Sequence, residues 1–209
     1  MRIDHMGKRP RGRLVDLYAD GAVALTLSPD TVQEAGLRLG DELTSVDIAR
    51  LRFEDDRKRA MRTALRLVAR RPHSESELRD RLRRDGFGKA LVDTTVTRVR
   101  ELGYVDDRAF AEYWTERRQT ATPRSRRMLR WELATKGVGA EVVSHVTEPL
   151  DDDEAAYRVA ARRARSLTNA DEARFRQKLA NSLQQRGFGW DAIRRAVDRC
   201  WAERAPSEN

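Results

Sequence analysis

The stretch RDGFGKALV at residues 84–92 contains a Gly-x-Gly-Lys run, and a glycine-rich turn followed by a lysine can cradle a phosphate group. The same pattern returns in two later stretches, TKGVGAEVV at 135–143 and QRGFGWDAI at 185–193. The place of Lys89 is taken there by Ala140 and Trp190, and the Lys-Ser/Thr ending of a phosphate loop is absent. The glycines are therefore predicted to end one helix and open the next, because glycine readily adopts the left-handed conformation that ends helices.

Other residue types that could do chemistry also favour structural roles. Acidic clusters stand at 55–56, 106–107 and 151–154, where we expect carboxylates to cap the N-termini of helices. The single cysteine, Cys200, falls in an apolar column of the repeat described below, which predicts a buried spacer. The sequence holds no Gly-x-Ser-x-Gly, Cys-x-x-Cys or paired-histidine motif. We therefore predict no catalytic residue, no cofactor and no metal site, and a protein that is not an enzyme.

The basic residues are where the sequence indicates a function. The chain of 209 residues has 42 Lys or Arg against 34 Asp or Glu, a net charge of +8, which favours a polyanionic partner. Residues 57–71 contain no acidic residue, and residues 117–136 contain only Glu132. Arginine in particular favours two-pronged contacts with phosphate or carboxylate. The candidate binding residues are Arg117, Arg118, Arg124, Arg126, Arg127, Arg130, Arg62, Arg66 and Arg70.

A repeat of the sequence must position these side chains. Its three copies are marked by the first glycine of each corner, Gly86, Gly137 and Gly187. Leucine stands eight and four residues before each of them, at Leu78, Leu82, Leu129, Leu133, Leu179 and Leu183. Because a buried helix face recurs at such spacings, we expect these leucines to be buried. A further helix precedes each pair, at 57–71, 107–119 and 154–167, so that each copy is predicted to be a three-helix unit.

The start of the chain has a different pattern. Residues 12–27 alternate apolar and polar side chains around Asp20-Gly21, which predicts a β-hairpin. The predicted fold class is mainly α, with tandem three-helix repeats forming an extended curved array behind a small N-terminal β-hairpin subdomain. The predicted domains are the subdomain with short helices at 1–50, then repeats at 51–105, 106–150 and 151–209.

One run of residues is specific enough to resemble a known family. ELGYVDDRAFAEYW at 101–114, followed by the basic stretch at 117–138, resembles the signature of the RecX regulatory proteins. RRPHSESELRDRL at 70–82 and the hairpin-like start fit the same family. The resemblance covers nearly the whole chain, roughly residues 12–203.

The resemblance implies a non-enzymatic modulator of the RecA recombinase. Such a protein would lie in the groove of the RecA filament on single-stranded DNA. It would inhibit filament growth, ATP hydrolysis, strand exchange and the co-protease activity of the SOS response, and so modulate recombination and DNA repair. We expect a cytoplasmic monomer without membrane contact, since no apolar run reaches the eighteen or more residues that a membrane-spanning helix needs.

Two alternatives stay open. A helix, a glycine corner and a second helix superficially match helix-turn-helix units, so a generic helical DNA-binding protein is the main rival. Those units read bases from one recognition helix, whereas here the basic residues are spread over several helices. The third possibility is a scaffold whose basic face meets an acidic protein.

Overall fold

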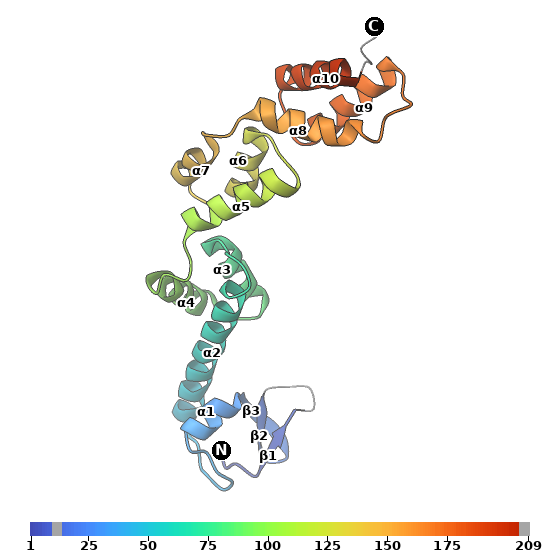
Figure 1. The fold of residues 1–209 in the computed structure, drawn as a ribbon. Coiled ribbons are helices and arrows are strands. Elements are labelled where there is room, and N and C mark those ends of the chain that lie inside the picture. The colour runs from blue at the N-terminus through green and yellow to red at the C-terminus, as the bar shows by residue number, and fades with distance from the viewer. Residues whose placement is uncertain (10–13, 205–209) are drawn as a thin grey trace. The chain divides into compact units, whose positions relative to one another are not determined.

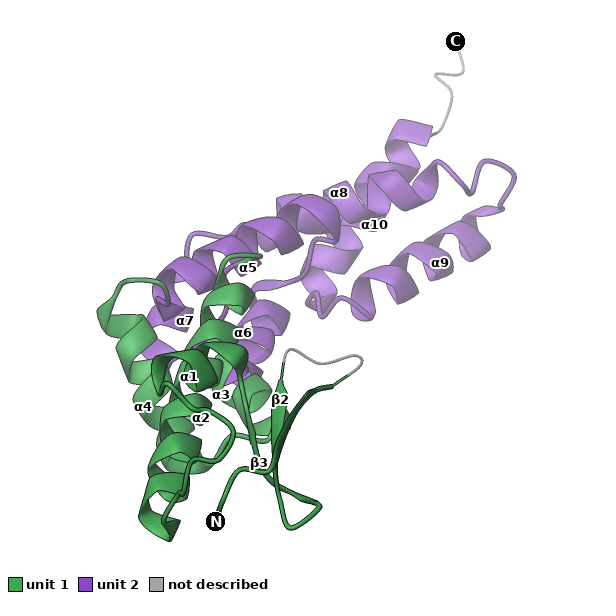
Figure 2. Cartoon of the chain, turned by 90° about the horizontal axis from the view of Figure 1, so that it is seen from below, with its two compact units in different colours: residues 1–71, 78–104 green, residues 72–77, 105–209 purple. Residues whose placement is uncertain are grey.

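The computed structural model describes residues 1–9 and 14–204 of the chain. The chain forms two compact units, residues 1–71 with 78–104 and residues 72–77 with 105–209 (Figure 2). Helices follow a small sheet along the chain (Figure 1), which confirms the predicted fold class of three-helix repeats behind an N-terminal β subdomain. Within the described residues, none of the helices combines the length and the apolar character that crossing a membrane requires.

The N-terminal sheet has three antiparallel strands in the order β1-β2-β3. The predicted hairpin is present as β2, Val15–Ala19, and β3, Ala22–Leu27, and its turn places Asp20 and Gly21 at positive φ. Such a turn matches the right-handed twist of the two strands. A third strand that the sequence analysis did not predict, β1 at His5–Lys8, pairs with β2.

The sheet is joined to the first repeat by α1, Pro29–Glu34, and α2, Ser45–Val68. Helix α2 begins at a capping box formed by Thr44 and Asp47, well before the predicted start at residue 57. It therefore runs across the domain border predicted at residue 50, so that the sheet subdomain and the first repeat share one helix.

The predicted capping role of the acidic pair 55–56 is wrong, because this pair lies inside α2. Asp55 is instead buried and accepts hydrogen bonds from the Ser28 backbone N–H and the Thr31 hydroxyl, both at 2.8 Å. Burying a carboxylate is favourable only where hydrogen bonds replace its water. Asp55 thus anchors α1 to α2.

Each repeat contains the helices that the sequence predicted. The first repeat combines the later part of α2 with α3, Glu75–Arg84, and α4, Lys89–Glu101. The second has α5, Asp107–Ala121, α6, Arg126–Thr135, and α7, Ala140–Thr147. The third has α8, Asp152–Ala164, α9, Glu172–Gln184, and α10, Trp190–Arg204. Helices α5 and α8 are capped by Asp106 and Asp151 as predicted, since each carboxylate accepts two backbone N–H bonds.

The leucine columns and the glycine corners are confirmed. All six predicted leucines have no exposed surface. The first glycines, Gly86, Gly137 and Gly187, have φ values of 92°, 76° and 82°, a region that favours glycine. Each corner then closes as a helix C-cap, for example where the Val138 N–H bonds to the Leu133 carbonyl at 3.1 Å. Lys89 is the exposed first residue of α4.

Two buried serines join neighbouring parts of the second unit. The Ser74 hydroxyl donates to the Lys136 carbonyl and the Ser125 hydroxyl to the Gly187 carbonyl, both at 2.7 Å. Each serine also accepts a backbone N–H from the first turn of its own helix. A Cβ atom on Gly187 would lie 2.8 Å from the Ser125 oxygen, so the corner can approach the serine only because it is glycine.

Candidate partner-binding surface

The six arginines predicted in the second repeat lie at the end of α5, in the loop that follows and on α6. In chain order they are Arg117 and Arg118 on α5, Arg124 in the loop, and Arg126, Arg127 and Arg130 on α6. The structure brings this part of the chain together around one carboxylate. Most of these side chains are consequently bound to the protein itself.

Glu132, on the inner face of α6, is that carboxylate, and it is buried. It accepts hydrogen bonds from the Trp114 indole N–H and the Arg118 Nε, both at 2.8 Å. The Arg124 Nε lies 3.6 Å from its other oxygen. A buried charge is tolerated when it is paired and hydrogen-bonded, and Glu132 meets both conditions. Arg118 and Arg124 are thus partly buried and paired within the second repeat.

Cations also cover the Trp114 ring beside this carboxylate. The Arg118 guanidinium lies 4.6 Å from the ring centroid, and the Lys136 ammonium lies 4.0 Å from it. Contacts between cations and an aromatic face at these distances are attractive. The same ammonium pairs with Glu77 at 2.5 Å. Lys136 therefore links the second repeat to the first turn of α3.

Two arginines of α6 link this helix to the segment that follows it. The side chain of Arg126 donates to the Leu150 carbonyl, and its backbone N–H donates to Asp152 at 2.7 Å. The Arg130 Nε donates to the Thr147 hydroxyl at 2.9 Å. These bonds join α6 to the end of α7 and the start of α8, so Arg126 in particular supports the fold.

The remaining two arginines of the second repeat are directed to solvent. Arg117 is exposed and contacts only the Tyr113 hydroxyl, at 2.9 Å, among the residues that the structure describes. Arg127 is exposed, and its side chain makes no hydrogen bond or ion pair within the described part of the chain. On the next turn of the same helix, Trp131 has 64% of its surface exposed. An exposed cation beside an exposed indole is typical of a binding surface.

The first unit holds the other three predicted arginines, which are all exposed: Arg62 and Arg66 on α2, and Arg70 just after its C-cap. Arg62 forms an ion pair with Asp30. Arg62 and Arg66 line a cavity of about 850 Å³ between α2, the end of α3 and the sheet subdomain. Its other charged residues are Lys8, Arg59, Arg81, Asp30 and Asp85. Cations outnumber carboxylates here, which makes this concave surface favourable for an anion.

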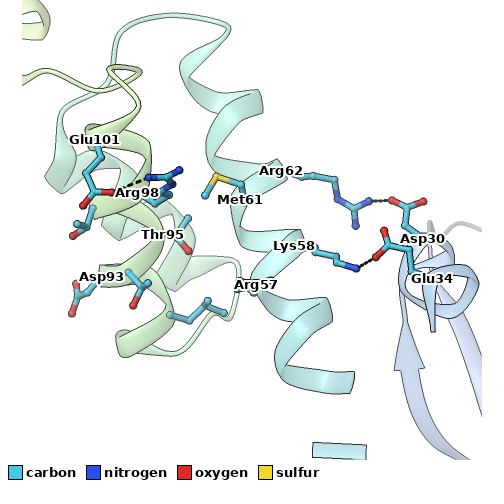
Figure 3. A pocket seen from close by; sticks show the side chains of 13 residues that line it. Asp30, Glu34, Arg57, Lys58, Met61, Arg62, Asp93, Thr95, Arg98 and Glu101 are labelled. Carbon is cyan, nitrogen blue, oxygen red and sulfur yellow. Dashed lines mark hydrogen bonds and ion pairs between the residues drawn. The ribbon is translucent and has the colours of Figure 1, made fainter. Parts of the chain in front are cut away.

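A second cavity of the first unit, of about 990 Å³, lies between α1, α2 and α4. Figure 3 shows the ion pairs Lys58–Glu34 and Arg62–Asp30 along one side and Arg98–Glu101 on the other. Met61 and Leu91 add apolar surface to its lining. Because its cations are matched by carboxylates, this cavity offers no net charge to a polyanion.

The third repeat holds basic residues that sequence reasoning missed. Arg162 and Arg163 on α8, and Arg186 at the corner after α9, lie near the loop that carries Arg124. A signal for two of them was present in the sequence. Arg162 and Arg163 follow the helix cap Asp151 at the same spacing at which Arg117 and Arg118 follow the cap Asp106.

The described residues contain no group of three or more His, Cys, Asp or Glu side chains placed to hold a metal ion. The paired groups that do occur, such as Glu132 with its arginines, are ion pairs. The exposed guanidinium groups of this surface are side chains of a type that can bind anionic groups.

Comparison with known proteins adds a family to this picture. Models of the first, second and third three-helix domains of RecX match residues 60–98, 106–146 and 151–197. The regulatory protein RecX of Chlorobium phaeobacteroides is 32% identical over 145 residues, which are 69% of this chain and 95% of the relative. The regulatory protein RecX of Caldanaerobacter subterraneus is 28% identical and aligns over 95% of this chain and 99% of its own length.

Solved structures agree on the fold. The crystal structure of a regulatory protein RecX has a TM-score of 0.62 at 21% identity, covering 94% of this chain and 98% of that chain. RecX from Lactobacillus salivarius has a TM-score of 0.60 at 17% identity, covering 71% of this chain and 99% of its own. Because three successive domain models match in order from residue 60 to residue 197, the chain belongs to the RecX family of regulatory proteins.

Proposed function

We propose that this chain binds the RecA filament on single-stranded DNA and lowers its ATPase, strand-exchange and co-protease activities. The observation that carries the proposal is membership of a family whose members are named regulatory proteins RecX. The predicted partner is consistent with a net charge of +8, because the filament carries the phosphates of its DNA.

Exposure and ion pairing support a choice among the predicted arginines for this contact. Four exposed arginines have no acidic partner among the described residues: Arg117 and Arg127 in the second repeat, Arg66 on α2, and Arg70 just after α2. Arg118, Arg124 and Arg126 are held by the protein itself. We therefore place the contact on the exposed set.

The test is the steady-state ATPase rate of RecA on single-stranded DNA with substoichiometric amounts of this protein. We expect the rate to fall. Arg127→Glu should weaken this inhibition by about tenfold or more while changing the free energy of unfolding by less than about 0.5 kcal/mol, since surface substitutions are usually mild. The matched control is Arg108→Glu, because Arg108 is equally exposed but is paired with Glu112 at 3.1 Å.

The rival function predicts a different pattern. A generic helical DNA-binding protein would leave the RecA ATPase unchanged at every protein ratio and would select one duplex sequence in a binding assay. Those two results together would replace the RecA proposal with the DNA-binding alternative.

A further inference from the structure

Arginines from three segments converge in the second compact unit, where α8, the end of α9 and the loop after α5 meet. They are Arg124 in the loop, Arg162 and Arg163 on α8, and Arg186 at the glycine corner that follows α9. Of these, only Arg124 belongs to the set that the sequence predicted. We call these four residues the arginine cluster.

Hydrogen bonds hold two members of the arginine cluster, Arg162 and Arg186, in place. The Arg162 guanidinium donates to the Ala121 carbonyl at the end of α5, at 3.1 Å. The Arg186 guanidinium donates to the carbonyl and hydroxyl oxygens of Ser182, at 2.7 and 2.9 Å. The Arg186 carbonyl accepts the Ser125 N–H at 3.1 Å, which fixes the corner beside the loop of Arg124. These bonds bring Arg162 and Arg186 close to the loop that carries Arg124.

The charges in the arginine cluster are of one sign. Burial lowers the pKa of Arg186, and repulsion from Arg124, Arg162 and Arg163 lowers it further. Arginine does not lose its proton at neutral pH, so the repulsion persists. The carboxylate that contacts the cluster is Glu132, which lies 3.6 Å from Arg124 and already binds Arg118 and Trp114. Arg162 and Arg163 are exposed and form no ion pair within the described chain.

We propose that Arg162, Arg163 and Arg186, with Arg124 beside them, form a binding site for successive phosphates of a single-stranded nucleic acid. A nucleic-acid strand carries one charge per nucleotide without interruption, so it can neutralise several neighbouring guanidinium groups at once. The planar guanidinium also matches the geometry of phosphate oxygens. The assignment deepens the proposed function, and rests on it, by placing a DNA contact in the third repeat.

The test is binding of a fluorescein-labelled oligothymidylate to the full chain in the absence of RecA, measured by anisotropy over a series of salt concentrations. For single strands the slope of log affinity against log salt changes by about 0.7 per phosphate contact. The double variant Arg162→Gln/Arg163→Gln should therefore reduce the magnitude of this negative slope by about 1.4. The single variant Arg163→Gln, which leaves the bond from Arg162 to the Ala121 carbonyl intact, should lower it by about 0.7.

The matched control is Arg194→Gln/Arg195→Gln, which removes the same charge from an adjacent pair of arginines on α10. Arg194 and Arg195 are already paired with Asp191 and Asp153, at 3.2 and 2.7 Å. The control should keep the wild-type slope to within about half a unit, because a cation that is already neutralised releases few counterions from DNA.

Three results would overturn the site. The first is an equal reduction of the slope's magnitude in both double variants, and the second is a wild-type slope in Arg163→Gln. The third is displacement of the oligonucleotide by polyglutamate at equal charge concentration. The last would show that the cluster takes acidic peptides. A wild-type protein that leaves the RecA ATPase unchanged, together with a lowered slope in the variants, would overturn the proposed function and support the site.

Discussion

The second and third repeats place different residues at the same position. Five residues before the first glycine of the corner, the second repeat has Glu132 and the third has Ser182. In the second repeat the carboxylate pairs with Arg118 and Arg124. In the third, the serine accepts a hydrogen bond from Arg186 but brings no charge.

A run of arginines in a sequence therefore does not by itself specify a charged surface. Residues 117–136 contain one acidic residue, yet that residue is buried and pairs with two of the arginines. In the third repeat, Arg162, Arg163 and Arg186 lie together without a carboxylate at the position of Glu132. The location of the neutralising carboxylate decides which arginines can bind a partner.

Removing the carboxylate of the second repeat should have a large effect on the stability of the protein. Glu132→Gln removes the charge that balances Arg118 and Arg124, and removing one partner of a buried ion pair costs about 3 kcal/mol in the free energy of unfolding. Urea denaturation measures the change. The control is Glu34→Gln, which breaks the exposed pair with Lys58 and should cost less than about 1 kcal/mol. Equal losses in the two variants would show that Glu132 is not a structural centre.

The six buried leucines and the three glycine corners could be predicted because they depend on spacing within one helix and its cap. The start of α2 lies at a local capping box, Thr44 and Asp47, that the sequence analysis does not use. The burial of Asp55 could not be predicted. Asp55 looks like a capping residue in sequence, but its partners Ser28 and Thr31 are distant along the chain. The same limit applies to the binding residues, because the pairing of Arg118 with Glu132 and the approach of Arg186 to Arg124 arise only from tertiary packing.

A smaller effect, on oligonucleotide affinity, is expected when a glutamate is placed in the third repeat at the position equivalent to Glu132. In Ser182→Glu, the new side chain can pair with Arg186, which should lower oligothymidylate affinity several-fold, on the order of 1 kcal/mol. The control is Ser182→Gln, which has nearly the same size without the charge and should bind as the wild type does. Anisotropy titration at one fixed salt concentration measures both. Equal affinities in the two variants would contradict a role for the charge of Arg186.

The smallest effect is expected at Cys200, which the third repeat places thirteen residues after its first glycine, where the second has Leu150. Cys200 is buried, and burial raises the pKa of its thiol to about 11. Because the thiolate is the reactive form, iodoacetamide at pH 8 should label the native protein slowly and the denatured protein quickly.

The raised pKa means that the folded state holds the thiol proton more tightly than the unfolded state does. Its contribution to stability is therefore complete below pH 9 and declines as the pH rises through 11. Cys200→Val lacks this thiol, so its free energy of unfolding should fall less than that of the wild type between pH 8 and pH 11. Its oligonucleotide binding should be unchanged. Rapid native labelling at pH 8, or lost binding in a folded Cys200→Val protein, would show that this position does more than fill the apolar column of the third repeat.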